Sequence, residues 1–599
     1  MSGLPSRDSI EDKYKWKLED VYSDEKLWEK DFKSVEAKFS EVESYRGKIN
    51  SPQNLLTVLN LRDEIGKTVD RLFTYARMRR DEDNTVSKYQ ILADKALHLA
   101  VESESRLSFV EPEILSLSKE ELLDFLSRDE KLELYRHYIN DLLRMKGHIL
   151  DTAGEKMLAD AGEMAQAPGD IFRMLDNADM RFPIIKDSEG NEIELTKGRY
   201  IGFMESIDRN VRKAAFEGMH ETYGKFINTF SSMLSFNVKK NIFYKNQRKF
   251  NSCLEASLFG DNIPTEVYDN LIQAVNDKLA LLHRYVRLRK KALELDDLHM
   301  YDLYVPLVKN YERKFSYDEA KQTVLEGLAP MGEDYQRLLK KGFDSGWIDV
   351  FENRGKTGGA YSWGSYGTHP YVLLNFQGKM NDVFTIAHEM GHALHTYYSN
   401  GRQPYIYSQY TIFLAEIAST CNEAILINSL LEKATNRQEK MFLLNHFMEQ
   451  FKATIYRQTM FAEFEKSIHE LAENGSPLNA EMLKNIYLKL NEKYYGPDIN
   501  VDSLIGWEWA RIPHFYTSFY VYKYSTGFSA AITISQRILE EGQKAVEKYK
   551  EFLSSGSSDY SLELLKKVDV DLTTPDPINR ALEVFENLLD EFEDYLEMP

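Results

Sequence analysis

The stretch that decides how this chain is built is DVFTIAHEMGHALHTYYSN, residues 382–400. Its apolar positions recur at helical intervals: Phe384, Ile386, Ala387, Met390 and Leu394. That spacing predicts an amphipathic helix. Asp382 is a suitable N-cap and Asn400-Gly401 is typical of a C-terminal stop, so we expect the helix to lie between them.

Two histidines of this helix share one face. His388 and His392 are four residues apart, so they lie one turn above each other. Two imidazoles at this spacing can bind one Zn²⁺ at about 2.0–2.1 Å. Glu389 follows the first histidine directly, which aims its carboxylate at a water on the metal. The metal lowers the pKa of that water, and Glu389 is then the general base as the water attacks a carbonyl.

A third histidine, His395, calls for a separate interpretation. It lies seven residues after His388, two turns and roughly 10 Å along the helix, so a straight helix cannot bring all three rings to one ion. Metzincins use a glycine and then a further histidine at fixed spacings after the second histidine. This chain has His395 and Tyr398 there, which excludes that family. We expect His395 to pack or to support a ligand.

The third ligand is therefore expected from the next predicted helix, YTIFLAEIASTCNEAILINSLLEKA, residues 410–434. Glu416 is acidic in an otherwise apolar stretch, and an antiparallel pair of helices would place it opposite the histidines. Two histidines and one glutamate leave the fourth zinc position open for water, as catalytic sites require. Glu423, on the same face, would orient a histidine ring through its other nitrogen. The alternatives are that Glu416 is a carboxylate that binds no metal and that Glu423 makes no contact with a metal-binding histidine.

Most of the remaining chain has helical periodicity, beginning with DEKLWEKDFKSVEAKF, residues 24–39, after a cap at Ser23 or Asp24. Two places break it. Residues 182–196 have β-like runs on both sides of a turn, which predicts a hairpin. Residues 346–378 are rich in glycine and contain two β-like runs. We divide the chain into an N-terminal helical region with the hairpin, residues 1–200, and a catalytic region, residues 201–599.

Composition narrows the class of protein. The chain has 599 residues, of which 43% are hydrophobic and 28% charged, as in a globular protein. A formal charge of −20 argues against nucleic acid or an anionic membrane as a partner. Two cysteines exclude a disulfide framework. Because no apolar leader or membrane-spanning run is present, we expect a cytoplasmic location.

Together with the histidine helix, several stretches resemble the oligoendopeptidase F family of zinc metallopeptidases, relatives of thimet oligopeptidase. They are HPYVLLNFQG, DVFTIAHEMGHALHTYYSN, FLAEIASTCNEAIL, IPHFYTSFYVYKYSTGFSAA and VDLTTPDPI. The N-terminal WKLEDVYSDEKLWEKDF and the segment SCLEASLFGDNIPTEVYDNLI look like the family's upstream segments. The resemblance covers almost the whole chain.

This resemblance implies a mainly α fold, with a large helical body divided by a deep substrate channel and a small β element beside the zinc helix. It implies one Zn²⁺ per chain, bound by His388, His392 and Glu416, with Glu389 as the base. Short peptides would be the substrates, because such a channel excludes folded proteins. The oligomeric state is not implied.

The family also stabilises the oxyanion of the reaction with a histidine and tyrosines from a downstream segment. Here that segment is HFYTSFYVYKY, residues 514–524. His514 and Tyr522 match the family best. Tyr516 and Tyr520 are alternatives because the spacing is shorter than in the thimet relatives. An ordinary aromatic core is the competing interpretation of these tyrosines.

The run YVLLNF, residues 371–376, fits a β-edge on which an extended peptide could pair through its main chain. Tyr371, Val372 and Leu373 would then bind substrate, whereas the alternative is a buried strand. The leading hypothesis is a metalloendopeptidase for short oligopeptides. A helical zinc carboxypeptidase with the same motif and a non-catalytic peptide-binding scaffold are the alternatives.

Overall fold

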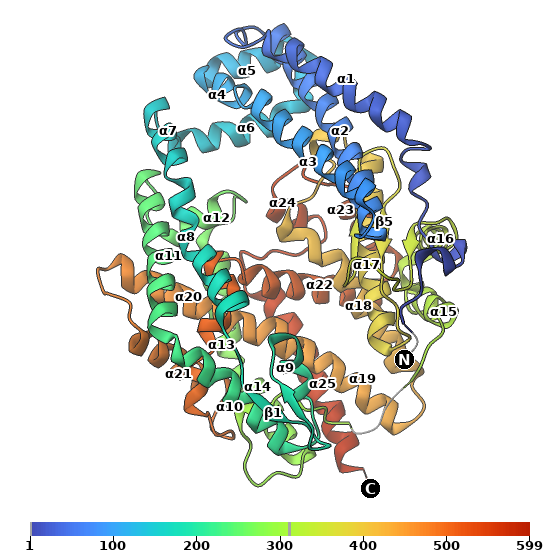
Figure 1. Ribbon diagram of the computed structural model, residues 1–599, viewed down its shortest axis with the longest axis vertical. Helices are drawn as coiled ribbons and strands as arrows, with labels where there is room; N and C mark the ends of the chain where they lie inside the picture. The colour runs from blue at the N-terminus through green and yellow to red at the C-terminus, as the bar shows by residue number, and fades with distance from the viewer. Residues whose placement is uncertain (1–2, 309–312, 599) are drawn as a thin grey trace. The chain divides into compact units, whose positions relative to one another are not determined.

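The computed structural model describes residues 3–308 and 313–598 (Figure 1). The chain packs as two compact units, each built from three separate stretches. Unit 1 takes its described residues from 1–147, 312–429 and 534–569, and unit 2 from 148–311, 430–533 and 570–599. The predicted boundary at residue 200 separates two consecutive regions of the chain, whereas each unit combines stretches from several parts of it. The predicted boundary therefore stays a prediction.

Both units are built mainly from helices, which confirms the mainly α prediction. The helices of unit 1 are α1 (Glu25–Glu43), α2 (Pro52–Glu82), α3 (Ser87–Leu107), α4 (Val110–Ser116), α5 (Lys119–Arg128), α6 (Arg136–Met145), α15 (Tyr317–Gly327), α16 (Gly332–Asp344), α17 (Met380–Arg402), α23 (Gln543–Leu553) and α24 (Ser561–Lys566). Those of unit 2 are α7 (Thr152–Asp160), α8 (Gly162–Met174), α9 (Lys197–Met204), α10 (Arg209–Lys225), α11 (Ile227–Gln247), α12 (Cys253–Phe259), α13 (Thr265–Asp277), α14 (Leu279–Ala292), α19 (Arg437–Phe451), α20 (Arg457–Glu473), α21 (Ala480–Tyr495) and α25 (Asp576–Glu597). Two more, α18 (Ile412–Lys433) and α22 (Tyr522–Glu541), contribute residues to both units.

The first of these helices shows how local sequence sets an element. Asp24 caps α1, because its carboxylate accepts hydrogen bonds from two main-chain N–H groups of the first turn. Trp28, Val35 and Phe39 are buried, whereas Leu27 is 45% exposed. They join a core formed by α1–α6 that extends to β5 (Tyr371–Leu373). The buried side chains of α1 therefore recur at helical intervals, while Leu27 at the helix start lies outside the core.

Two small sheets occupy the places where the helical pattern breaks. In unit 2, β1 (Ile184–Lys186) pairs antiparallel with β2 (Glu192–Glu194), which confirms the hairpin. In unit 1, β3 (Ile348–Asp349), β4 (Tyr361–Trp363) and β5 form a three-stranded sheet that precedes α17, so the β element beside the histidine helix is also confirmed.

The order of that sheet corrects one prediction. The strands lie in the order β3-β5-β4, so β5 is the central strand and not an edge. Tyr371, Val372 and Leu373 are 0% exposed. Both neighbours already use the main-chain groups of β5, with β3 parallel and β4 antiparallel to it. The expected β-edge at residues 371–376 is wrong, because β3 and β4 are the two edge strands of this sheet.

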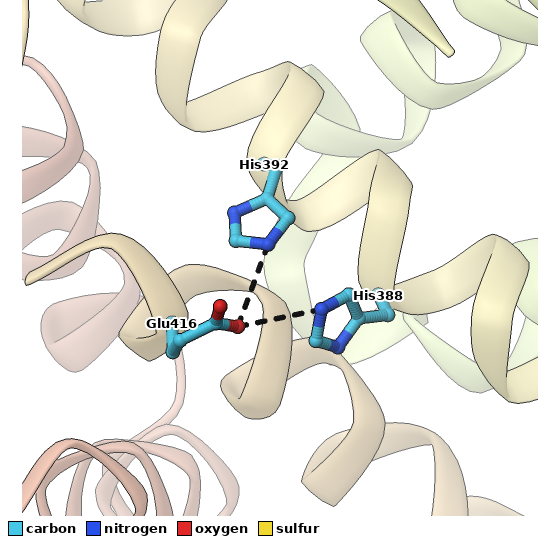
Figure 2. Close-up of side chains that lie close together, drawn as sticks. All are labelled: His388, His392 and Glu416. Atoms are coloured by element: carbon cyan, nitrogen blue, oxygen red, sulfur yellow. Dashed lines mark ion pairs between the residues drawn. The ribbon is translucent and has the colours of Figure 1, made fainter. Parts of the chain in front are cut away.

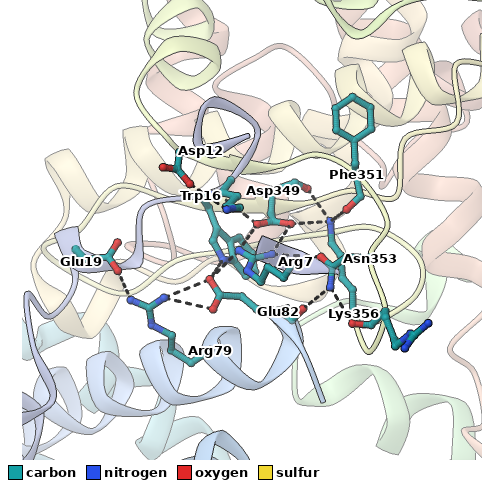
Figure 3. Close-up of polar contacts among 12 residues, drawn as sticks. Arg7, Asp12, Trp16, Glu19, Arg79, Glu82, Asp349, Phe351, Asn353 and Lys356 are labelled. Carbon is teal, nitrogen blue, oxygen red and sulfur yellow. Dashed lines mark hydrogen bonds and ion pairs between the residues drawn. The ribbon is translucent and has the colours of Figure 1, made fainter. Parts of the chain in front are cut away.

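A buried ion-pair network fixes the N-terminal segment of unit 1 (Figure 3). Arg7 lies between Glu82 at the end of α2, at 2.9 Å, and Asp349 of β3, at 2.6 Å. Lys356 contacts the same Asp349 at 2.7 Å, and its side chain is 0% exposed. Trp16 donates its indole N–H to Glu82 at 2.8 Å. The segment before α1 is thereby tied to both α2 and the sheet.

None of the described helices is both long and apolar enough to cross a membrane. Cys253 and Cys421 are buried free thiols.

Candidate metal centre

The histidine helix, α17, is longer than predicted. It begins at Met380, after an N-cap at Lys379 instead of Asp382, and it ends at Arg402, beyond the predicted stop at Asn400-Gly401. Asp382 lies in its first turn, where the carboxylate accepts the N–H groups of Lys379, at 2.8 Å, and Gln377, at 3.0 Å. Asp382 therefore stabilises the helix start from inside the first turn instead of serving as the N-cap. Gly401 lies inside the last turn without a left-handed conformation.

Helix α18 packs closely on α17, and this packing brings Glu416 of α18 toward His388 and His392 of α17. A Cβ at Gly391 would lie 2.6 Å from the Ser419 Cα and 2.7 Å from the Ala418 carbonyl oxygen. Only glycine permits this approach of the two backbones. Asn422 of α18 also donates to the carbonyl of Ala387, at 2.9 Å. The glycine within HEMGH thus acts on the geometry of the site, a role that the sequence analysis missed.

His388, His392 and Glu416 converge in the way that the two helices were expected to place them (Figure 2). The Glu416 Oε2 atom lies 3.4 Å from His388 Nε2 and 3.5 Å from His392 Nε2. One ligand atom from each residue lies within 4.8 Å of the other two. For ligands about 2.0–2.1 Å from a tetrahedral metal, the edge between nitrogen and oxygen is about 3.4 Å. The three residues therefore fit a tetrahedral divalent metal.

Glu423 lies on the other side of the His388 ring. The Nδ1 atom of His388 is hydrogen-bonded to a carboxylate oxygen of Glu423. Because a carboxylate accepts, Nδ1 carries the proton and Nε2 points toward Glu416. Ser419 in turn donates to Glu416 Oε2, at 3.0 Å. His388 and Glu416 are thus each held by a further partner, which orients the atoms that they present to a metal.

Without a bound metal, the contacts within the group favour a positive charge on His388 and a negative charge on Glu416. Burial lowers the pKa of His388, but the contacts with Glu416 and Glu423 outweigh it and raise that pKa to about 10. The contacts with His388 and His392 hold the pKa of Glu416 well below its usual range. The carboxylate of Glu416 is therefore ionised at neutral pH, as a metal ligand must be.

Glu389 differs from the other carboxylates. It is 7% exposed, and burial raises the pKa of its side chain, against the lowering effect of His388 and His392. Among the described residues, none forms an ion pair with it. A buried carboxylate with a raised pKa beside a metal group is suited to accept a proton.

His395 packs and does not join the group. Its ring is 1% exposed and stacks on Tyr410, with ring centroids 3.6 Å apart. Burial lowers its pKa to about 3, so the ring is neutral. The expectation of a packing role is therefore consistent with its position, and Tyr410 is the partner that sequence could not name.

The downstream segment belongs to unit 2 and is described within that unit. His514 lies beside Tyr524, with 3.2 Å between Nε2 and the hydroxyl, and beside Tyr520, with ring centroids 6.1 Å apart. Tyr522 is 1% exposed and packs against Tyr268, whose ring centroid is 5.2 Å away. Tyr522 therefore lies in the core, while Tyr520 and Tyr524 are the tyrosines around His514.

Tyr516 has a different neighbour. Its ring stacks on Phe172 of α8, with centroids 4.4 Å apart. The roles of His514, Tyr516 and Tyr522 stay predictions. Tyr524 was missed, although its spacing of four residues from Tyr520 could have suggested that the two rings are neighbours: their centroids lie 5.5 Å apart.

Comparison with known proteins bears on the chemistry of this group. The model of peptidase family M3 matches residues 202–584, and that of Oligopeptidase F matches residues 113–182. The chain belongs to peptidase family M3. Oligopeptidase PepF of Bacillus subtilis is 46% identical over 99% of this chain and 89% of its own length. Membership in the family makes this chain a metalloendopeptidase, as the resemblance implied.

Solved structures of relatives agree with this M3 assignment. Oligoendopeptidase-F from Enterococcus faecium is 37% identical, with a TM-score of 0.74, over 96% of this chain and 99% of that one. A Chlamydophila abortus protein described as a peptidase is 36% identical, with a TM-score of 0.94, over 99% of this chain and 100% of that one. These likenesses confirm the mainly α fold of the M3 chain.

Proposed function

We propose that this M3 peptidase is a zinc-dependent endopeptidase that hydrolyses internal bonds of short oligopeptides. The observation that carries the proposal is the group of His388, His392 and Glu416 at distances that suit a tetrahedral zinc ion, with Glu389 in the same turn of α17. Substrate length is inferred from the relatives, whose names describe oligopeptidases.

In this mechanism His388, His392 and Glu416 hold the metal. A bound zinc ion lowers the pKa of water and polarises the carbonyl of the peptide. Glu389 accepts the proton of the attacking water on its carboxylate and delivers it to the leaving amine. Glu423 keeps the His388 ring oriented through Nδ1. His514, with a neighbouring tyrosine, donates to the oxygen on which negative charge develops.

We place the substrate on the outer side of β4 instead of on β5. The sheet order leaves β3 and β4 as edge strands, and the N-terminal segment already bonds the main chain next to β3, from the Lys17 N–H to the Gly346 carbonyl and from the Val350 N–H to the Tyr14 carbonyl. An extended chain could therefore add beyond β4. Trp363 of β4 is 42% exposed, so its indole is available to an apolar side chain of the peptide. Main-chain pairing gives affinity with little dependence on side chains, which suits an enzyme with broad sequence tolerance.

The test uses a quenched-fluorescent peptide blocked at both ends. We expect internal cleavage, identified by the masses of both products, because an endopeptidase needs no free terminus. A carboxypeptidase would leave this peptide intact but trim the same peptide with a free C-terminus. A folded protein containing the same sequence in a helix is the control and should resist cleavage. No hydrolysis of any of the three would contradict the proposal.

The identity of the metal is tested separately. Protein purified without added metal should contain close to one zinc per chain, and chelation followed by zinc should remove and restore activity. A metal content near zero that zinc cannot restore would favour the non-catalytic scaffold. A cytoplasmic location stays a prediction.

A further inference from the structure

The segment between the 3-10 helix η12 (Pro513–Tyr516) and α22 contains one residue with an unusual backbone. Phe519 has a φ of +59°, in the left-handed region that bulky residues avoid because Cβ approaches the carbonyl oxygen. Its side chain is 2% exposed. Such a conformation persists only where the surroundings hold it in place, and it is found most often at functional sites.

One buried carboxyl group holds this residue. Glu465 of α20 accepts the main-chain N–H of Phe519 on Oε1, at 3.0 Å, and is 1% exposed. Its Oε2 atom is buried without a hydrogen-bond partner, and no described lysine, arginine or histidine forms an ion pair with Glu465. Burying a carboxyl group without a counter-charge is costly. A leucine here would fill the same space at lower cost, so an ordinary core role does not explain Glu465.

Neighbouring side chains hold the same segment at other points. Asn237 of α11 donates to the carbonyl of Phe515, at 3.0 Å, and Asn241 donates to Ser518 Oγ, at 2.8 Å. His469 Nδ1 lies 2.8 Å from the Glu465 carbonyl, which can only accept, so Nε2 is the nitrogen that accepts from Asn241, at 3.1 Å.

The charges around Glu465 agree with this arrangement. Burial lowers the pKa of His469 to about 4, so this ring is neutral. Burial also raises the pKa of Glu465 to about 8, which keeps the carboxyl group mostly protonated at neutral pH. The polar contacts behind the segment are therefore made without a full charge.

We propose that Glu465 is a positioning residue for the segment 513–521. By accepting the Phe519 N–H it stabilises the left-handed turn, and this turn sets the positions of His514 before it and Tyr520 after it. The inference rests on the proposed function, in which His514 donates to the developing oxyanion. Glu465 itself does not touch substrate. It acts through the backbone of the segment.

The main test compares Glu465→Leu with Glu465→Gln on the blocked peptide. Leucine removes the acceptor, so we expect kcat to fall roughly 10- to 100-fold, the scale of an angstrom-sized misplacement. KM should change little, because the oxyanion contact is made only in the transition state. Glutamine keeps an oxygen for the Phe519 N–H and should stay near the wild-type rate. Bound zinc, measured on the same samples, should be unchanged in both.

A second test asks whether the effect passes through Phe519. Glycine adopts the left-handed conformation without help, so Glu465→Leu should cost little further activity in a Phe519→Gly background. Phe519→Ala is the matched background, because it also lacks the ring but keeps the Cβ that disfavours this conformation. There Glu465→Leu should retain its effect. Ser467→Ala, elsewhere on α20, controls for changes to the helix.

The outcomes separate the two proposals. An inactive wild type contradicts the proposed function and not this inference alone. An active wild type with unchanged kcat in Glu465→Leu, or with equal losses in the glycine and alanine backgrounds, overturns the positioning role. A lower melting temperature of Glu465→Leu with full kcat per zinc-loaded chain would mean that Glu465 serves stability only.

Discussion

Unit 1 contains two polar clusters that resemble each other in residue types but differ in charge and in burial: Asp349 and Lys356 of the first are buried, whereas the Glu416 side chain of the second is 48% exposed. In the N-terminal network, Arg7, Arg79 and Lys356 face Glu19, Glu82 and Asp349, so each acid has a cation. In the metal group, three carboxylates surround two imidazoles, and the described ion pairs of Glu416 come from histidine only. The first cluster is complete by itself. The second has more carboxylates than imidazoles, and a divalent metal would supply further positive charge there.

The largest expected effect is loss of the metal. Glu416→Ala removes one of three ligands, so zinc and activity should both disappear, as measured by metal analysis after gel filtration. Glu423→Gln leaves the ligand set intact and should weaken zinc binding only by roughly 10- to 100-fold. Full zinc occupancy in Glu416→Ala would mean that another residue is the third ligand.

The next effect separates catalysis from metal binding. Glu389→Gln removes the proton acceptor but no ligand, so turnover of the fluorescent peptide should fall by about 10²–10⁴-fold with zinc retained. Thermal unfolding of the variant serves as the control for folding. Activity comparable to that of the wild type would exclude Glu389 as the base.

A substitution in the N-terminal network should change the stability of the fold and leave the metal group intact. Asp349→Ala leaves the buried cations Arg7 and Lys356 without their shared partner, which should lower the free energy of unfolding by about 3–5 kcal/mol. Denaturant unfolding measures this, and bound zinc in the folded fraction should be unchanged. Replacing Lys95, whose side chain is 49% exposed in its ion pair, is the matched control and should have no measurable effect.

The smallest effect is that of pH on zinc affinity. The metal-free protein holds a proton on His388, whose pKa is raised to about 10, and zinc must displace it. Affinity should therefore fall about tenfold for each pH unit below that value. The same raised pKa stabilises the metal-free fold below about pH 6.5, and this contribution is lost as the pH rises toward 10. Competition with a chelator at pH 7 and 8 measures the slope, and equal affinities would contradict it.

The positions of residues along one helix could be predicted from the sequence better than the contacts between separate elements. The spacing of His388 and His392 fixed their shared face, and the cap at Asp24 was one of the two predicted positions. The start of α17 was misplaced, because Asp382 accepts main-chain N–H groups from inside the first turn and the N-cap is Lys379. The helix also continues to Arg402, beyond the predicted stop at Asn400-Gly401. The position of β5 was also wrong, since periodicity shows that a strand is buried but not how many neighbours it has.

By itself the sequence determined the helical architecture, the two histidines with Glu389, and Glu416 as the candidate ligand, because covalent spacing along a helix sets which side chains share a face. Only the tertiary structure decided the distance from Glu416 to the histidines, the stacking of His395 on Tyr410, and the support that Glu465 gives to Phe519. These depend on how closely separate helices pack. At the metal centre that distance is set by a glycine, Gly391, whose importance lies in the Cβ that it lacks.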